Sequence, residues 1–202
     1  MNKSLDKLIV ENNGYLITSI ASQYGYSRQN VAYYANKNKL EKISRGIYIT
    51  DNTWPDDLYI SLLKNKEIVY SFETSLYLHG LMDREPTFTE VTVKYGYNAT
   101  RLKEKGYKIH TSIDDIYKMG IVPIKTQFGN IVNTYDMERT ICDIIKYKDS
   151  MDIQVFNTAL KEYVKKKNKR IHVLSEYAER LKVSDQVRTY MEVLLWLKVQ
   201  CN

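Results

Sequence analysis

The sequence contains few of the residues that build disulfide frameworks, metal knuckles or phosphate-binding loops. Its only two cysteines, Cys142 and Cys201, lie far apart and have no metal-ligand spacing around them. The sequence therefore supports neither a disulfide framework nor a zinc knuckle, and it favours a reducing cytoplasm. The eight glycines form neither a P-loop nor a dinucleotide-binding pattern, and we expect no cofactor and no metal.

Long apolar segments are also absent. The first residues, MNKSLDKLIVENNG, contain no apolar run long enough for a signal peptide. No stretch approaches the roughly 20 apolar residues of a membrane span. We therefore expect a soluble, cytoplasmic protein with no membrane partner. The sequence also lacks internal repeats, low-complexity tracts and a long flexible linker, and its 202 residues allow one large domain or two smaller ones.

Basic residues are in excess. The formal net charge is +6, which favours an anionic partner without requiring one. Hydrophobic residues make up 44% of the chain, which is enough for a core. Because 18 residues are tyrosine, many of these side chains must be partly exposed.

The first fifty residues have the order of a winged helix-turn-helix. A short helix is predicted from the spacing of Leu5, Leu8 and Ile9, and it ends at Asn12-Asn13-Gly14. A second helix, capped by Thr18 or Ser19, stops at Gly25, and Ser27 caps a third that runs to about Asn38. Two short β-like runs follow, Leu40–Ile43 and Ile47–Thr50, joined by a turn at Ser44-Arg45-Gly46. This order predicts a unit that binds duplex DNA.

The third helix of this unit has two different faces. On a helical wheel, Ser27, Val31, Tyr34 and Ala35 share the side expected to pack on the first two helices. The opposite side is rich in amides, and no acid occurs from Arg28 to Leu40. Asn and Gln side chains can pair with adenine and Arg with guanine, although any exposed helix face is polar.

We therefore predict two groups of DNA-binding residues. The residues expected to read bases from the third helix are Gln29, Asn30, Tyr33 and Asn36. The residues expected mainly to hold phosphate are Arg28, Lys37, Lys42 and Arg45. Arg45, at the hairpin tip, could instead reach into the minor groove.

The remaining 150 residues predict an α+β domain. Helices are expected after Pro55 and over Ser71–His79, and strands over TFTEVTVKY, Tyr107–Thr111, Ile121–Phe128 and Ile131–Thr134, with a hairpin signal at Gly129-Asn130. Asp136 caps a helix over MERTICDIIKY, and further helices are expected near 152–167, 172–182 and 185–199. The predicted fold is thus α+β: a winged helix-turn-helix over residues 1–52, then a mixed α+β domain over 53–202. That second domain should have a small, mainly antiparallel sheet and a helical C-terminus.

Four segments in this order resemble the AbiEi-type antitoxin family: ISRGIYIT, SFETSLYLHGL, EVTVKY and YDMERTICDII. These proteins are regulators of type IV toxin–antitoxin pairs in bacterial abortive-infection (phage-defence) systems. The resemblance covers essentially the whole chain, with conservative differences at Ser75 and Ile141. It implies an N-terminal domain that binds inverted repeats in its own promoter and represses transcription. It also implies a C-terminal domain that counteracts a nucleotidyltransferase-like toxin without forming a stable complex with it.

The segment YDMERTICDII has two interpretations. Arg139 and Asp143 can form an i, i+4 ion pair, with Arg139 also binding neighbouring backbone carbonyls or another carboxylate. Alternatively, Asp136, Glu138 and Asp143 form an acidic metal site of the kind nucleases use. We favour the first, because Arg139 and Lys146 would partly neutralise the carboxylates.

The histidines and the basic run complete the candidate residues. His79 is expected at a helix C-terminus, where it can bind free carbonyls, and His110 and His172 have no recognisable partner. We therefore expect no catalytic residue and no enzyme; a nuclease or nucleotide-modifying enzyme and a ligand-sensing one-component repressor are the alternatives. The run KKKNKR is either a solvated helix end or a second nucleic-acid contact, and its cations are Lys165, Lys166, Lys167, Lys169 and Arg170.

Overall fold

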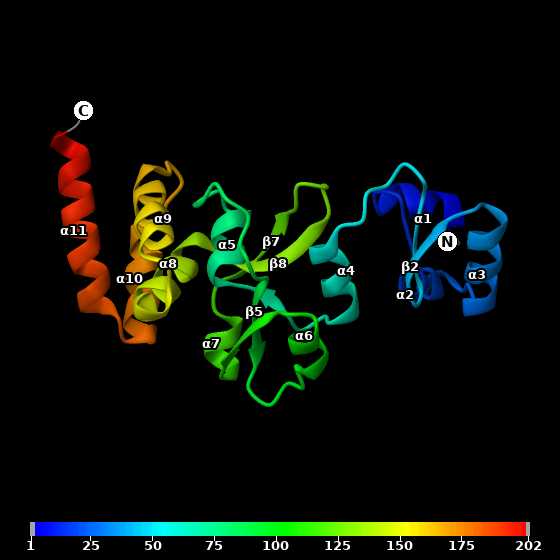
Figure 1. The fold of residues 1–202 in the computed structure, drawn as a ribbon, viewed down its shortest axis with the longest axis horizontal. Helices are drawn as coiled ribbons and strands as arrows, with labels where there is room; N and C mark the ends of the chain where they lie inside the picture. Colours follow the sequence, from blue (N-terminus) through cyan, green and yellow to red (C-terminus); the bar gives the residue numbers. More distant parts are fainter. Residues whose placement is uncertain (1–2, 201–202) are drawn as a thin grey trace. The chain divides into compact units, whose positions relative to one another are not determined.

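The computed structural model describes residues 3–200, with side chains as far as residue 194, and the fold is α+β (Figure 1). The chain divides into two compact units. The first contains Met1–Asn65 and Lys125–Val132, and the second contains Lys66–Ile124 and Asn133–Asn202. The helix after Pro55 belongs to the first unit, so these units do not coincide with the expected division between residues 52 and 53.

The first unit combines short helices with a small antiparallel sheet (Figure 1). Its elements are α1 (Leu5–Glu11), β1 (Tyr15–Ile17), α2 (Thr18–Ala21), η1 (Ser22–Tyr24), α3 (Arg28–Lys37), β2 (Glu41–Ser44), β3 (Ile47–Ile49) and α4 (Asp57–Lys64). The strand order is β1-β3-β2, and both pairings are antiparallel. The β2–β3 hairpin confirms the predicted turn, whereas β1 was not predicted because three apolar residues are too few to show an alternating pattern.

Local capping explains where these helices begin and end. Ser27 caps α3 as predicted, since its side chain accepts a hydrogen bond from the backbone N–H of Asn30 at 3.1 Å. Gly25 ends the preceding turn with a φ of 87°, a left-handed conformation that favours glycine. The predicted cap of α2 was wrong: Ile17 occupies that position and makes no side-chain capping bond.

The core of the first unit holds α3 against α1. Val31 and Ala35 are buried with Leu8 and neighbouring apolar residues, as the helical wheel predicted. The Tyr34 hydroxyl donates to the Asp6 carboxylate of α1, and burial together with this contact raises the pKa of Tyr34 to about 12. Ser27 was expected on the packed side but is exposed, because its side chain is used in the cap.

The rest of the chain forms a mixed sheet followed by helices. The elements are β4 (Val69–Tyr70), α5 (Phe72–Leu78), β5 (Glu90–Lys94), α6 (Thr100–Glu104), β6 (Lys108–Ser112), α7 (Asp114–Lys118), β7 (Ile121–Lys125), β8 (Ile131–Tyr135), α8 (Met137–Lys146), η2 (Lys148–Ser150), α9 (Ile153–Lys165), α10 (Ile171–Leu181) and α11 (Ser184–Gln200). The predicted helical C-terminus is confirmed. Helix α8 packs against α5, α9 and α10 around a buried core that includes Ile141 and Ile144 (Figure 1).

The larger sheet has the order β6-β5-β4-β8-β7. Strand β5 pairs in parallel with β6, β4 pairs in parallel with β8, and only the β4–β5 pairing among these three is antiparallel. The prediction of a mainly antiparallel sheet was therefore wrong. The parallel pairings could not be predicted locally. Helix α6 lies in the crossover between β5 and β6, and β4 pairs with β8, a strand some sixty residues later in the chain. The hairpin at Gly129-Asn130 is confirmed, since the Thr126 N–H donates to the Asn130 carbonyl at 2.8 Å.

Cys142 is fully buried, and burial raises the pKa of its thiol, which makes it unreactive. Cys201 lies outside the described residues. Over the part of the chain that the structure describes, no helix combines the length and apolar character needed to cross a membrane.

Candidate functional site

The eight predicted DNA-binding residues all lie on the surface of the first unit. Six of them follow one another around the exposed side of α3, where Tyr33 keeps 70% of its surface exposed. The other two, Lys42 and Arg45, are exposed on β2 and at the tip of the β2–β3 hairpin. All eight side chains are therefore accessible to a ligand, and Arg28 of α3 lines one hollow together with Lys42 and Arg45 of the hairpin.

These eight side chains are not held by hydrogen bonds or ion pairs to other described residues. Among the residues that the structure describes, none of them forms a side-chain hydrogen bond or an ion pair with another residue. Elsewhere on the surface, ion pairs are common, as between Lys3 and Glu11 at 2.7 Å. An unpaired amide or cation can bind a ligand without first breaking an existing contact.

A basic hollow lies between the start of α3 and the hairpin. It has a volume of about 560 Å³, and no acidic residue is among the described residues that line it. Three cations already identified contribute to it, Arg28, Lys42 and Arg45, and Lys64 of α4 adds a fourth. Hydroxyl groups of Thr18, Ser19 and Ser22 complete the polar lining. The arrangement suits a phosphate group, for which cations and hydroxyls are common donors.

Sequence reasoning missed Lys64 and the three hydroxyl residues of this hollow. Lys64 follows the hairpin by about fifteen residues and is the last residue of a separate helix, so no local pattern connects it to Arg45. The hydroxyls precede Gly25 and lie on α2 and η1. Their position depends on a nonlocal contact, because the N–H of Thr18, at the start of α2, donates to the Gly46 carbonyl at 2.8 Å and so holds α2 against the hairpin.

In the second unit, Arg139 ties α8 to its surroundings. Its Nε donates to both carboxylate oxygens of Asp143 at 3.0 Å, and its Nη1 donates to the carbonyls of Ile116 and Met119. Both charged side chains are almost fully buried. Burial raises the pKa of the Asp143 carboxyl, while the Arg139 guanidinium opposes that shift. These contacts confirm the interpretation of Arg139 as a structural residue.

The other two carboxylates of the segment also meet an arginine. Arg170 Nη2 lies 2.7 Å from Asp136 Oδ2 and 2.7 Å from Glu138 Oε2, and its backbone N–H donates to Glu138 Oε1 at 2.8 Å. Tyr163 donates a further bond to Glu138, which is fully buried. Within the described residues, no group of three His, Cys, Asp or Glu side chains could hold a metal ion.

Four of the five cations in the basic run at the end of α9 contact other residues of the protein. Lys165 pairs with Glu162, the Lys166 ammonium donates to the His79 carbonyl at 3.1 Å, and the Lys169 ammonium donates to the Lys166 carbonyl at 3.0 Å. Arg170 is turned towards Asp136 and Glu138, as described above. Lys167 is exposed. A second nucleic-acid contact at this run stays a prediction.

His79 lies at the C-terminal cap of α5, where the sequence placed it. Its Nε2 is 2.6 Å from the Tyr135 carbonyl oxygen, and the imidazole is mostly enclosed. Burial lowers the pKa of His79, although the nearby carboxylates of Asp136 and Glu138 oppose that shift. A neutral imidazole donating Nε2–H to a carbonyl fits this environment.

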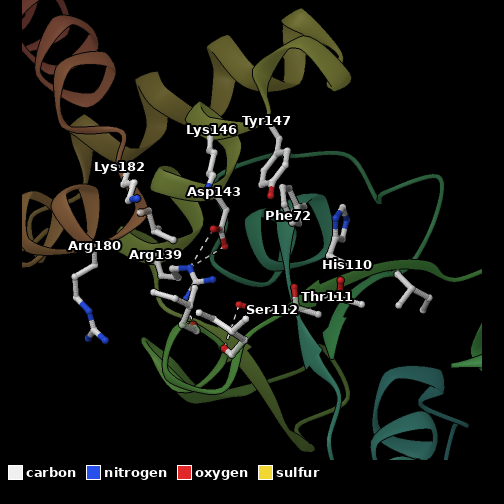
Figure 2. Close-up of a pocket in the computed structure, with 15 residues that line it drawn as sticks. Phe72, His110, Thr111, Ser112, Arg139, Asp143, Lys146, Tyr147, Arg180 and Lys182 are labelled. Carbon is white, nitrogen blue, oxygen red and sulfur yellow. Dashed lines mark hydrogen bonds and ion pairs between the residues drawn. The ribbon is translucent and has the colours of Figure 1, made fainter. Parts of the chain in front are cut away.

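A second cavity, of about 600 Å³, opens in the second unit (Figure 2). Its lining includes the Arg139–Asp143 pair and residues from β6, α5 and the C-terminal ends of α8 and α10. Figure 2 shows Arg180 and Lys182 on one side of this pair and the rings of Phe72 and Tyr147 on the other. The sequence did not indicate this cavity, because its residues are spread over more than one hundred positions.

His110 is one of the residues that sequence reasoning left isolated. In the structure its ring stacks on Phe72, with centroids 3.9 Å apart, and its Nε2 lies 2.6 Å from Glu90 Oε2. Phe72 has a φ of 48°, a left-handed conformation that is strained for a residue with a bulky side chain. Phe72, the residue with this strained backbone, also lines the cavity.

Comparisons with known proteins identify no relative: no family model matches this chain, and no curated protein matches it.

Proposed function

We propose that the first unit is a winged helix-turn-helix that binds duplex DNA, and that the protein is a transcriptional autorepressor and antitoxin. In this proposal α3 enters the major groove and the β2–β3 hairpin is the wing. The partners are promoter DNA with inverted repeats and, in function, a nucleotidyltransferase-like toxin. The protein would act in the cytoplasm, and it would not be an enzyme.

The observation that carries this proposal is the hollow between α3 and the hairpin, whose described lining contains cations and hydroxyls but no acid, beside the exposed amides of α3. The amides and cations of α3 and the hairpin are exposed and uncommitted, and the hollow collects Arg28, Lys42, Arg45 and Lys64. An ordinary solvated helix face usually mixes acidic and basic residues, which form pairs along the helix. A surface with amides on one helix and cations around it instead matches the division between base readout and phosphate contact.

The expected roles follow from side-chain chemistry. Gln29, Asn30, Tyr33 and Asn36 would contact bases, since amides can pair with adenine and a phenol can contact a thymine methyl or a phosphate. Arg28, Lys37, Lys42 and Arg45 would mainly contact phosphates. Lys64 joins this second group because it lines the same hollow as Arg45.

The antitoxin part of the proposal is supported by the resemblance of four segments to AbiEi-type antitoxins. Two of these segments, SFETSLYLHGL and YDMERTICDII, include α5 and α8, which pack together in the second unit. A nuclease is less well supported, because the carboxylates of Asp136, Glu138 and Asp143 are bound by arginines. An acid that is paired with a guanidinium is poorly placed to bind a metal ion.

The test is binding of the purified protein to its own upstream DNA and to scrambled DNA over a series of salt concentrations. We expect Asn36→Ala to cost about 1–3 kcal/mol on the specific site and to relax the sequence preference. Lys37→Ala should weaken binding to both DNAs similarly and lower the slope of log K against log salt by about one. Lys103→Ala, which removes an exposed cation from α6, is the matched control and should leave binding unchanged.

Equal and weak binding to both DNAs would contradict the proposal, as would specific binding that Asn36→Ala leaves untouched. The antitoxin activity is tested separately, by coexpression with the gene directly downstream. Growth that is restored by the protein would support that activity, and toxicity that it does not relieve would contradict it.

A further inference from the structure

The cavity of the second unit is lined by three cations that form no ion pair in the part of the chain that the structure describes. Lys146, Arg180 and Lys182 all line it, and among the described residues none of the three forms an ion pair with a carboxylate. Among the described residues that line the cavity, Asp143 is the only acid, and it is already bound by Arg139. The cavity therefore has an excess of three positive charges over the neutralised Arg139–Asp143 pair.

Helix geometry accounts for only part of this arrangement. Lys146 is in the last turn of α8 and Arg180 is in the last turn of α10. Cations are common in the last turn because they interact favourably with the helix dipole. That effect acts separately on each helix. It does not explain why the two helix ends and Lys182, from the cap of α10, contribute to a single cavity.

Aromatic rings form another part of the cavity wall. Tyr147 remains 49% exposed, and its ring meets that of Phe72 edge-on with centroids 5.6 Å apart. Phe72 is buried and stacks on His110, so this wall is supported from behind. An exposed, supported ring is a surface on which a flat heterocycle can stack. Figure 2 shows these rings across the Arg139–Asp143 pair from Arg180 and Lys182.

From these observations we propose that this cavity binds a nucleoside di- or triphosphate. Lys146, Arg180 and Lys182 would bind the phosphates, and Tyr147 would stack on the base. The hydroxyls of Thr111 and Ser112, which also line the cavity, are suitable donors to a phosphate or partners for a ribose. A volume of about 600 Å³ is in the range of small-molecule sites. This site uses side chains rather than a glycine-rich loop, in agreement with the absence of such a loop from the sequence.

The proposal is tested by titrating the full-length protein with GTP and with ATP in a calorimeter, without DNA. We expect saturable binding of at least one of them, weakened at least tenfold in both Arg180→Gln and Lys146→Gln. Tyr147→Leu should weaken nucleotide binding but not the binding of inorganic triphosphate. Lys103→Gln, which replaces an exposed cation that does not line the cavity, is the control and should bind as the unaltered protein does.

Several outcomes would overturn the proposal. The proposal would be wrong if neither nucleotide bound saturably. It would also be wrong if the Arg180 and Lys146 variants bound the nucleotides as tightly as the unaltered protein. Inorganic triphosphate binding as tightly as the nucleotides would show that the cavity recognises only the anion. Because Lys146, Tyr147 and Arg180 are exposed, the variants should stay folded, and their melting temperatures check this. The experiment does not depend on DNA binding, so its outcome is independent of the function proposed above.

Discussion

Arg170 connects the basic run to two carboxylates that are nearly inaccessible to solvent. The side chains of Asp136 and Glu138 are 8% and 1% exposed, whereas that of Arg170 is 46% exposed. We expect Arg170→Ala to lower the free energy of unfolding by about 1–3 kcal/mol, because a buried carboxylate would lose its charged donor. Lys167→Ala, an exposed residue of the same run, should change it by less than about 0.5 kcal/mol. Urea unfolding measures both, and equal losses in the two variants would contradict the role of Arg170.

A second residue, His79, should make stability depend on pH. Burial lowers the pKa of His79 in the folded protein, so the unfolded chain binds a proton more readily as the pH falls below the ordinary histidine value. Its contribution to stability is therefore fully present above about pH 6.5 and decreases as the pH falls below that value.

This dependence is measured by urea unfolding at pH 7.5 and pH 5.5. His79→Gln retains an N–H that can donate to the Tyr135 carbonyl but cannot be protonated in this range. The variant should consequently lose less stability between the two pH values than the unaltered protein. Asp136, Glu138 and Lys166, which also face His79, are present in both proteins. An equal loss in both proteins would exclude His79 as the source.

Helix α3 is the element on which the proposed DNA readout depends. Its first turn is held by Ser27, whose side chain accepts the Asn30 N–H. We expect Ser27→Ala to destabilise the protein by about 0.5–2 kcal/mol and to weaken specific DNA binding, because a frayed first turn loosens Arg28, Gln29 and Asn30.

The matched control for this prediction is Ser4→Ala. Ser4 caps α1 in the same way, by accepting the N–H of Lys7 at 3.3 Å. Ser4→Ala should reduce stability to a similar degree while leaving the DNA affinity of the folded protein unchanged. If both substitutions weakened DNA binding equally in the folded protein, positioning by the α3 cap would not explain the effect.

At the scale of the whole molecule, the two compact units each contribute one candidate site. The exposed surface of α3 was predicted from sequence because neighbours on a helix are three or four residues apart, and their shared face follows from the helical period. The cavity beside α8 was not predicted, because it joins Phe72, Tyr147 and Arg180 through tertiary packing. The same distinction applies to Arg170, whose partners lie more than thirty residues before it in the chain.

The sequence by itself determined the α+β class, the helices from α8 to α11, the caps at Ser27 and Asp136, and the hairpins at Arg45-Gly46 and Gly129-Asn130. These features depend on contacts within a few residues, so local propensity and periodicity are sufficient to specify them. Only the tertiary structure decided the parallel pairing of β4 with β8, the burial of Glu138 against Arg170, and the gathering of Lys146, Arg180 and Lys182. Such contacts close long loops, and they form because the complete core stabilises them together rather than because any local pattern requires them.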